Sequence, residues 1–271
     1  MENKKVVIIT GAAKGIGKAT ALKFAAHQYN LVLIDKDKEA LKETGKILKK
    51  AYGNVFLLRG GDIGNLNFLK LSIEKTVEKW GRIDAVVNNA AWRTIETMRT
   101  MDINTWTQTL NICLTAPAFL AKWSAEIMEK QGIKGVFINI SSMMSIRPAG
   151  NSPAYIAAKG ALESLTKELA VTYGRSGIRA LTIQPGFIDT DMSRDYQDTE
   201  GGSLNAVLTQ YLVNATPLKR GGSPEEIAEA IVWLCSDAAA FITGTNVLID
   251  GGFTHNMNDY ALKKRLFPNE Y

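Results

Sequence analysis

A tyrosine and a lysine stand four residues apart in segment 151–160, NSPAYIAAKG. Ser152 followed by Pro153 has the pattern of a helix N-cap with proline at the first helical position. Residues four apart lie on one face of a helix, so Tyr155 and Lys159 are predicted to be neighbours. They are either a surface pair without function or a proton-transfer pair. The second role is chemically reasonable because a nearby ammonium lowers the pKa of a phenol toward the working range of a general base.

A second candidate site is the glycine-rich segment TGAAKGIG at residues 10–17. Glycine lets the backbone approach a pyrophosphate closely, and a following helix presents free N–H groups and a positive dipole end. The spacing of Gly11, Gly15 and Gly17 departs from the usual GxGxxG fingerprint. A glycine turn directly after a strand nevertheless indicates a dinucleotide site.

Asp35 stands at the end of the next predicted strand. A carboxylate there accepts hydrogen bonds from the adenosine ribose hydroxyls and repels a 2′-phosphate, although capping of the next helix is an alternative role. Lys14 and Lys36 lie close in sequence and would partly neutralise Asp35. NAD is therefore the expected cofactor, and NADP stays open.

Short apolar strands alternate with helical segments around these residues. The strands are predicted at 4–10, 31–35, 54–58, 84–90, 135–141, 178–186 and 245–252. The helices are predicted at 15–28, 37–51, 65–80, about 102–130, 153–173 and 224–236. This pattern predicts a single α/β domain, a Rossmann-type doubly wound parallel sheet with helices on both faces.

Ligands of such sheets bind at the carboxyl ends of the strands. The loops expected to meet there follow Thr10, Asp35, Leu58, Asn88, Ile140 and Gln184. Residues 1–252 are expected to form the catalytic domain, and the polar segment 188–216 is predicted to be a mobile flap over the crevice. The tail 253–271 carries too many apolar side chains for a free end, so we expect it to pack on the domain or on a neighbouring subunit.

Composition excludes several other classes. The 271 residues are 46% apolar and 22% charged with a net charge of +5, which is ordinary for a globular protein and shows no basic stripe with interleaved aromatics for nucleic acid. Cys113 and Cys235 lack a CxxC partner, and His27 and His255 are isolated, so free thiols in a reducing compartment and no metal site are expected. No apolar run suits a signal core or a membrane span, so a cytoplasmic location is expected.

These motifs, in this order and spacing, resemble the short-chain dehydrogenase/reductase family over roughly residues 3–252. TGAAKGIG matches its TGxxxGxG cofactor turn, and YIAAK (155–159) matches its Tyr-x-x-x-Lys. GDI (61–63) resembles its adenine-binding Asp-aliphatic pair, and PGFIDT (185–190) its PGxxxT. NNAA (88–91) resembles its NNAG, with Ala91 in place of glycine, a change that we expect to be tolerated.

The resemblance implies an NAD(P)-dependent oxidoreductase that interconverts a secondary alcohol and a ketone. Tyr155 would be the general acid and base, and Lys159 would tune it and hold the nicotinamide ribose. Ser142, thirteen residues before Tyr155, would bind the substrate oxygen, although Ser141 is adjacent. Asn111 would hold a water. The implied cofactor residues are Gly11, Lys14, Gly15, Ile16, Gly17, Asp35, Asp62, Ile63, Asn89, Ala90, Tyr155, Lys159, Pro185, Gly186, Ile188 and Thr190.

The substrate is less well specified. The expected wall of its pocket includes Trp92, Arg93, Met143, Met144, Arg147, Asn151, Phe187, Met192, Arg194 and Tyr196. The predicted substrate residues among them are Trp92, Met144, Arg147, Phe187 and Met192, and either Arg147 or Arg194 would suit a carboxylate clamp. A polar alcohol or ketone such as a sugar, polyol or hydroxy acid is preferred.

Two alternatives stay open. A 3-oxoacyl thioester reductase would need a basic docking patch for an acidic carrier protein, and none is distinct in the sequence. A non-catalytic NAD-binding regulator would keep the glycine turn and Asp35 without the Ser-Tyr-Lys set. The family resemblance further implies a homotetramer built on the helices near 102–130 and 153–173 and on the last strand.

Overall fold

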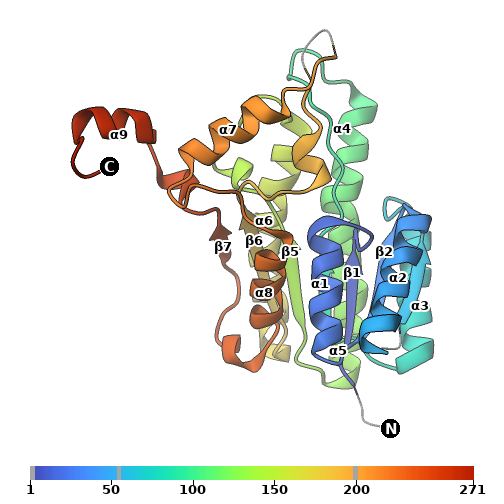
Figure 1. Cartoon of the computed structure of the whole chain (residues 1–271). Helices are drawn as coiled ribbons and strands as arrows, with labels where there is room; N and C mark the ends of the chain where they lie inside the picture. The colour runs from blue at the N-terminus through green and yellow to red at the C-terminus, as the bar shows by residue number, and fades with distance from the viewer. Residues whose placement is uncertain (1–3, 54–55, 198–200) are drawn as a thin grey trace.

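The computed structural model describes residues 4–53, 56–197 and 201–271. Seven parallel strands form one sheet in the order β3-β2-β1-β4-β5-β6-β7 (Figure 1). They are β1 (Val6–Thr10), β2 (Asn30–Asp35), β3 (Phe56–Gly60), β4 (Ala85–Asn88), β5 (Val136–Ile140), β6 (Arg179–Pro185) and β7 (Asn246–Ile249). The Rossmann-type sheet is confirmed. Residues 54–55, where the third strand was predicted to begin, lie outside the described residues.

Helices cover both faces of the sheet, as predicted. The helices of the described residues are α1 (Gly15–Ala26), α2 (Lys38–Tyr52), α3 (Leu66–Trp80), α4 (Ile103–Leu110), α5 (Ala116–Gln131), α6 (Pro153–Tyr173), α7 (Asn205–Ala215), α8 (Pro224–Leu234) and α9 (Tyr260–Leu266). One apolar core joins the sheet to α1, α2 and α8, and the other joins it to α3, α5 and α6. In β1, Val6 and Ile8 belong to one core and Val7 and Ile9 to the other, which is why these four residues are buried.

The long helical region predicted at about 102–130 is divided by a short π-helical segment. This segment runs from Asn111 to Thr115 and links α4 to α5. Single π-helical turns interrupt the regular hydrogen-bond ladder and bend a helix. The π-helical segment begins at Asn111, the residue that the family resemblance assigns to a water site.

The segment 188–216 has more regular structure than a flap of polar composition suggests. A 3₁₀ turn at Asp191–Arg194 follows β6, and α7 occupies most of its second half. Residues 198–200 lie outside the described part of the chain. The mobility of this segment stays a prediction.

The order of the strands reverses between β1 and β4, so the loops after these two strands diverge. The amides of Asn89 and Ala90 each donate to the Thr10 hydroxyl at 3.0 Å, which fixes the start of the loop after β4 against the end of β1. A crevice at this position is the expected ligand site of a doubly wound sheet. Within the described residues, no helix is long and apolar enough to cross a bilayer.

Candidate active site

A cavity of about 500 Å³ opens at the carboxyl end of the sheet. It is lined by the loops after β1, β2, β4, β5 and β6 and by residues of the 3₁₀ turn and α7. This volume is typical of a small-molecule site. The loop after β3 was expected in the lining but does not contribute, because β3 is the outermost strand of the sheet.

The glycine turn forms one end of the cavity. Gly11 and Gly15 have φ angles of +66° and +51°, a backbone region that favours glycine. A Cβ on Gly17 would lie 2.0 Å from the Gly11 carbonyl oxygen, so the start of α1 packs directly against the turn. Lys14 precedes α1 and makes no side-chain cap, which leaves the first N–H groups of the helix available to an anion. The turn therefore fits the pyrophosphate of a dinucleotide.

Asp35 lines the same end of the cavity and is held by the backbone. Its two carboxylate oxygens accept from the amides of Ala13 and Asp37, each at 2.9 Å. Lys14, which was expected to help neutralise Asp35, instead pairs with Asp37 at 3.1 Å. Asp37, more than Asp35, raises the pKa of Lys14.

Tyr155, Ser142 and Lys159 line the other end of the cavity. Pro153 opens α6 as predicted, and Tyr155 and Lys159 follow one turn apart, 8% and 2% exposed. The Lys159 ammonium donates to the carbonyl of Ile140 at 2.5 Å and lies 5.4 Å from the centre of the Tyr155 ring. The Ser152 hydroxyl does not cap the helix, but donates to the carbonyls of Thr94 and Asn151.

The acidity of Tyr155 differs from the expectation. Burial raises the pKa of the phenol, and the Cys113 thiol adds to this rise. The Arg93 guanidinium and a hydrogen bond with Ser142 lower this pKa, but their effect is smaller than that of burial. The sequence shows the neighbouring Lys159, but it does not show how deeply the phenol is buried.

Burial lowers the pKa of Lys159, and the Glu163 carboxylate opposes that change. Glu163 is one further turn along α6, a position that the sequence-based prediction missed although the spacing of four residues signals it. It accepts hydrogen bonds from Ser141 at 2.6 Å and Gln184 at 2.9 Å. Because Ser141 is committed to Glu163, Ser142 is the serine available on the cavity side, as the family spacing predicts.

Most predicted cofactor residues line the cavity. They are Gly11, Lys14, Gly15, Ile16, Asp35, Asn89, Ala90, Tyr155, Lys159, Pro185, Gly186, Ile188 and Thr190. Gly17 lies behind the turn, where its role is close packing. Asp62 and Ile63 are outside the lining: the Asp62 carboxylate accepts from the Gly64 amide, and Ile63 belongs to the core.

The predicted substrate residues are divided. Met144, Phe187 and Met192 line the cavity. Trp92 packs against the core instead. Arg147 is engaged elsewhere, because its guanidinium donates to the Phe253 carbonyl at 2.6 Å and covers the ring of that residue.

Of four other polar candidates, two lie outside the cavity lining and two are part of it. Arg194 pairs with Asp189 at the surface and is not a lining residue. Asn111 is exposed at the start of the π-helical segment, outside the lining. Arg93 and Tyr196 do line the cavity, together with Leu208 and Leu212 of α7, a helix that the sequence-based prediction missed.

Comparison with known proteins agrees with this geometry. Residues 11–254 match a family model described as enoyl-(acyl carrier protein) reductase. The short chain dehydrogenase/reductase astE of Aspergillus oryzae is 34% identical over 251 residues, which cover 92% of this chain and 95% of that protein. The chain belongs to the short-chain dehydrogenase/reductase family. It is thus an enzyme of a family that uses NAD(P) and acts on CH–OH groups.

Two solved structures that match this chain have the same fold. A 4-hydroxyisoleucine dehydrogenase complexed with NADH is 29% identical, with a TM-score of 0.83, and the match covers 93% of this chain and 99% of that one. The L-sorbose reductase of Gluconobacter frateurii, complexed with NADPH and L-sorbose, is 29% identical with a TM-score of 0.86, covering 93% and 97%. These two relatives hold different nicotinamide cofactors.

Proposed function

We propose that this enzyme interconverts a small polar secondary alcohol and its ketone, with Tyr155 as the general acid and base. The supporting observation is that Tyr155, Ser142 and Lys159 line one cavity with the glycine turn and Asp35. This arrangement places a proton-transfer group at one end and a dinucleotide cradle at the other. A non-catalytic NAD-binding regulator would have no need of the first of these.

When bound, NAD(P) supplies the hydride acceptor in oxidation and the hydride donor in reduction. Tyr155 gives a proton to the substrate oxygen in reduction and takes it back in oxidation. Ser142 orients that oxygen by hydrogen bonding. Burial keeps the phenol protonated, which is the form needed for reduction, while the Arg93 cation favours the phenolate needed for oxidation.

The proposed cofactor is NAD. Asp35 is held at the end of β2 by two backbone amides. Of the two lysines expected to neutralise it, Lys14 pairs with Asp37, whereas Lys36 lines the cavity. A carboxylate at this position repels a 2′-phosphate. NADP is the alternative, and the relative that carries NADPH is the reason to test it.

The proposed substrates are sugars, polyols and hydroxy acids. The substrate end of the cavity combines the side chains of Met144, Phe187 and Met192 with the polar groups of Arg93 and Tyr196. One relative in the comparison binds L-sorbose and another is named for a hydroxy amino acid, 4-hydroxyisoleucine. The second candidate is a 3-oxoacyl thioester reductase. The description of the matching family model also names a thioester, although its reaction is the reduction of an enoyl group.

The first experiment is a screen for NADH or NADPH formation and consumption. The panel contains sugars, polyols, hydroxy acids and their ketones, and 3-oxoacyl and enoyl thioesters. Tyr155→Phe is expected to lower kcat by about 10²–10⁴-fold, the usual contribution of a general acid–base. The affinity for NADH, measured by fluorescence titration, should stay within about twofold because the ring is retained.

Tyr52→Phe is the matched control, since Tyr52 is an exposed tyrosine at the end of α2 and does not line the cavity. Its kinetics should equal those of the unaltered enzyme. Full turnover by Tyr155→Phe would refute the assigned role of the phenol. Turnover of thioesters alone would replace the polar-substrate proposal with the second candidate.

We further propose a cytoplasmic homotetramer in which residues 1–252 form the catalytic domain and residues 188–216 act as its substrate flap. The tail 253–271 is proposed to pack on a neighbouring subunit. Its first residues are attached to the chain's own domain, since Asn256 donates to the Ala215 carbonyl and Lys219 covers the Tyr260 ring. The helix α9 beyond them lies away from the body of the domain (Figure 1).

A further inference from the structure

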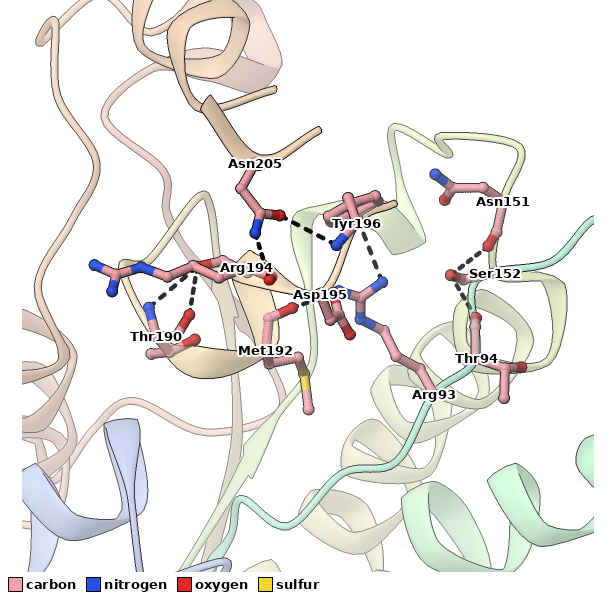
Figure 2. Close-up of polar contacts among 11 residues, drawn as sticks. Arg93, Thr94, Asn151, Ser152, Thr190, Met192, Arg194, Asp195, Tyr196 and Asn205 are labelled. Carbon is pink, nitrogen blue, oxygen red and sulfur yellow. Dashed lines mark hydrogen bonds and ion pairs between the residues drawn. The ribbon is translucent and has the colours of Figure 1, made fainter. Parts of the chain in front are cut away.

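Arg93, in the loop after β4, is a charged side chain that is almost completely buried at the edge of the cavity. Its side chain is 6% exposed. The guanidinium donates to the Met192 carbonyl at 2.6 Å, to the Asp195 carboxylate at 2.7 Å and to the Tyr196 hydroxyl at 3.3 Å (Figure 2). The central guanidinium carbon, Cζ, also lies 5.0 Å from the centre of the Tyr196 ring. All four contacts go to one stretch of the flap, residues 192–196, which we call the flap turn.

The loop that carries Arg93 is fixed on both sides of this residue. The Cys113 thiol donates to the Trp92 carbonyl, and the Ser152 hydroxyl donates to the Thr94 carbonyl at 3.1 Å. The amide of Glu96 donates to the Asn151 carbonyl at 3.0 Å. Arg93 therefore projects from a support that is anchored to the helices behind the cavity, and the flap turn is the partner that it positions.

The flap turn is internally braced but depends on other contacts for its place over the cavity. Asn205 at the start of α7 donates to the Arg194 carbonyl and accepts from the Tyr196 amide, so the turn and α7 hold together (Figure 2). Just before the flap turn, the Thr190 amide donates to the Ser193 hydroxyl, and the Ser193 amide donates to the Thr190 carbonyl. Met192 and Tyr196 both line the cavity, so moving this unit opens its substrate end.

We propose that Arg93 is a positioning residue for the reaction, which fastens the flap turn across the substrate end of the cavity and fixes the wall that faces Tyr155. A buried guanidinium bound to a carboxylate and a carbonyl forms strong, directional hydrogen bonds. Opening of the flap would break the hydrogen bonds from the guanidinium to Met192 and Asp195, which opposes opening.

The position of Arg93 also couples the closed flap to proton transfer. The groups that act on Tyr155 are Arg93 from the loop after β4, Cys113 from the π-helical segment, Tyr196 from the flap turn, and Ser142 after β5. Lys159 lies one turn along α6. The guanidinium lowers the pKa of the phenol, whereas the cysteine and the second phenol raise it. A purely mechanical fastener would not affect this acidity.

The first test needs no substrate. Hydrogen exchange of the NADH-bound enzyme, followed by mass spectrometry, reports on the amides of Thr190, Ser193 and Tyr196, whose hydrogen bonds within the flap break when the flap turn unfolds locally. The contacts with Arg93 oppose this local unfolding, because the flap turn must leave the guanidinium to unfold. Arg93→Gln is expected to accelerate their exchange at least about tenfold, the loss of one charge-assisted hydrogen bond. Amides of α6 serve as the internal reference for global unfolding.

Two further variants make this test specific. Arg194→Gln is the matched control, because Arg194 lies in the same flap turn but pairs with Asp189 at the surface. It should leave the exchange unchanged. Tyr196→Phe and Asp195→Asn weaken the contact from the flap side, so they should accelerate exchange even if Arg93→Gln fails to fold.

The kinetic test rests on the proposed function and uses the best substrate of the panel. Arg93→Gln should raise KM about tenfold and shift the alkaline-rising limb of kcat/KM for alcohol oxidation to higher pH, since the cation near the phenol is lost. Arg93→Lys keeps the charge but not the fork of donors. It should raise KM while leaving the pH profile in place.

The two tests fail separately. Exchange in the flap that is equal for Arg93→Gln and the unaltered enzyme, or equally fast for Arg93→Gln and Arg194→Gln, overturns the proposal. Unchanged KM and pH profile in Arg93→Gln also overturn it. If Tyr155→Phe retains full turnover, the proposed function is lost, but the exchange experiment still decides whether Arg93 fastens the flap turn.

Discussion

The Tyr155 phenol and the Lys159 ammonium are neighbours on α6, but proximity in the helix is not what dominates their acidity. Burial raises the pKa of the phenol and lowers that of the ammonium. Both shifts favour the neutral forms of the two groups. The cation with the larger effect on Tyr155 comes from a different loop, at Arg93. The acidity of Tyr155 therefore depends on side chains that are distant from it in sequence.

Asp35 carries the clearest prediction at this scale. Asp35→Asn removes the charge and keeps a carbonyl oxygen for the Ala13 amide. The repulsion of a 2′-phosphate by a carboxylate at contact distance is about 1–4 kcal/mol, depending on the local dielectric. We expect the preference for NAD over NADP, measured as a ratio of kcat/KM values, to fall at least about tenfold in this variant. Equal use of both cofactors by the unaltered enzyme would contradict the prediction.

At the scale of the elements, the helix α1 packs directly against the glycine turn through Gly17. A Cβ on Gly17 would lie 2.0 Å from the Gly11 carbonyl oxygen and 2.6 Å from the Asn89 amide nitrogen. The first of these is backbone, which cannot move without displacing the glycine turn. The close approach of α1 to the turn is what directs its N-terminal N–H groups into the cavity.

Gly17→Ala is thus expected to lower the free energy of unfolding by about 1–3 kcal/mol or more, the cost of overpacking, and to weaken NADH binding at the same time. Gly174→Ala provides the control. Gly174 has helical dihedral angles of −59° and −35°, and a Cβ there would meet nothing within 4 Å. It should be neutral or stabilising by about 0.4–1 kcal/mol. Thermal unfolding and NADH titration measure both effects, and a Gly17→Ala protein with unaltered NADH affinity would disprove the role of this packing.

At the scale of the whole molecule, the contacts within one chain do not explain why the C-terminal segment exposes apolar side chains. The helix α9 extends away from the domain (Figure 1). As a result, three apolar side chains of the tail are exposed, at 44% for Leu262, 57% for Leu266 and 51% for Phe267. Apolar side chains gathered on a projecting helix are typical of a surface that another subunit covers. This supports packing on a neighbouring subunit over packing on the chain's own active site.

Deletion of residues 258–271 should accordingly weaken the proposed tetramer. Light scattering with size-exclusion chromatography over a range of protein concentrations is expected to show dissociation at concentrations where the full chain stays assembled. The thermal midpoint should fall with it, because assembly stabilises the folded state by mass action. Assembly, stability and kinetics that all match the full chain would show that the tail has no such role.

The sequence by itself determined the fold class and the glycine-turn end of the cavity. Period and composition distinguish strands from helices locally, and the carboxyl ends of parallel strands must share one edge of the sheet. The glycine turn, Asp35 and the Tyr-Lys pair are therefore brought to one edge by the order of the elements along the chain. Their backbone requirements, such as the left-handed conformation of Gly11, are encoded by the residues themselves.

Only the tertiary structure decided the substrate end. Arg93 is held at the cavity by Asp195 and Tyr196, which are distant in the chain. Arg147 is drawn away from it by Phe253, which is also distant. Arg194 stays at the surface because it pairs with the carboxylate of Asp189. The burial of Tyr155 is likewise set by several elements packed together. These properties depend on long-range packing, which local patterns of residues do not specify.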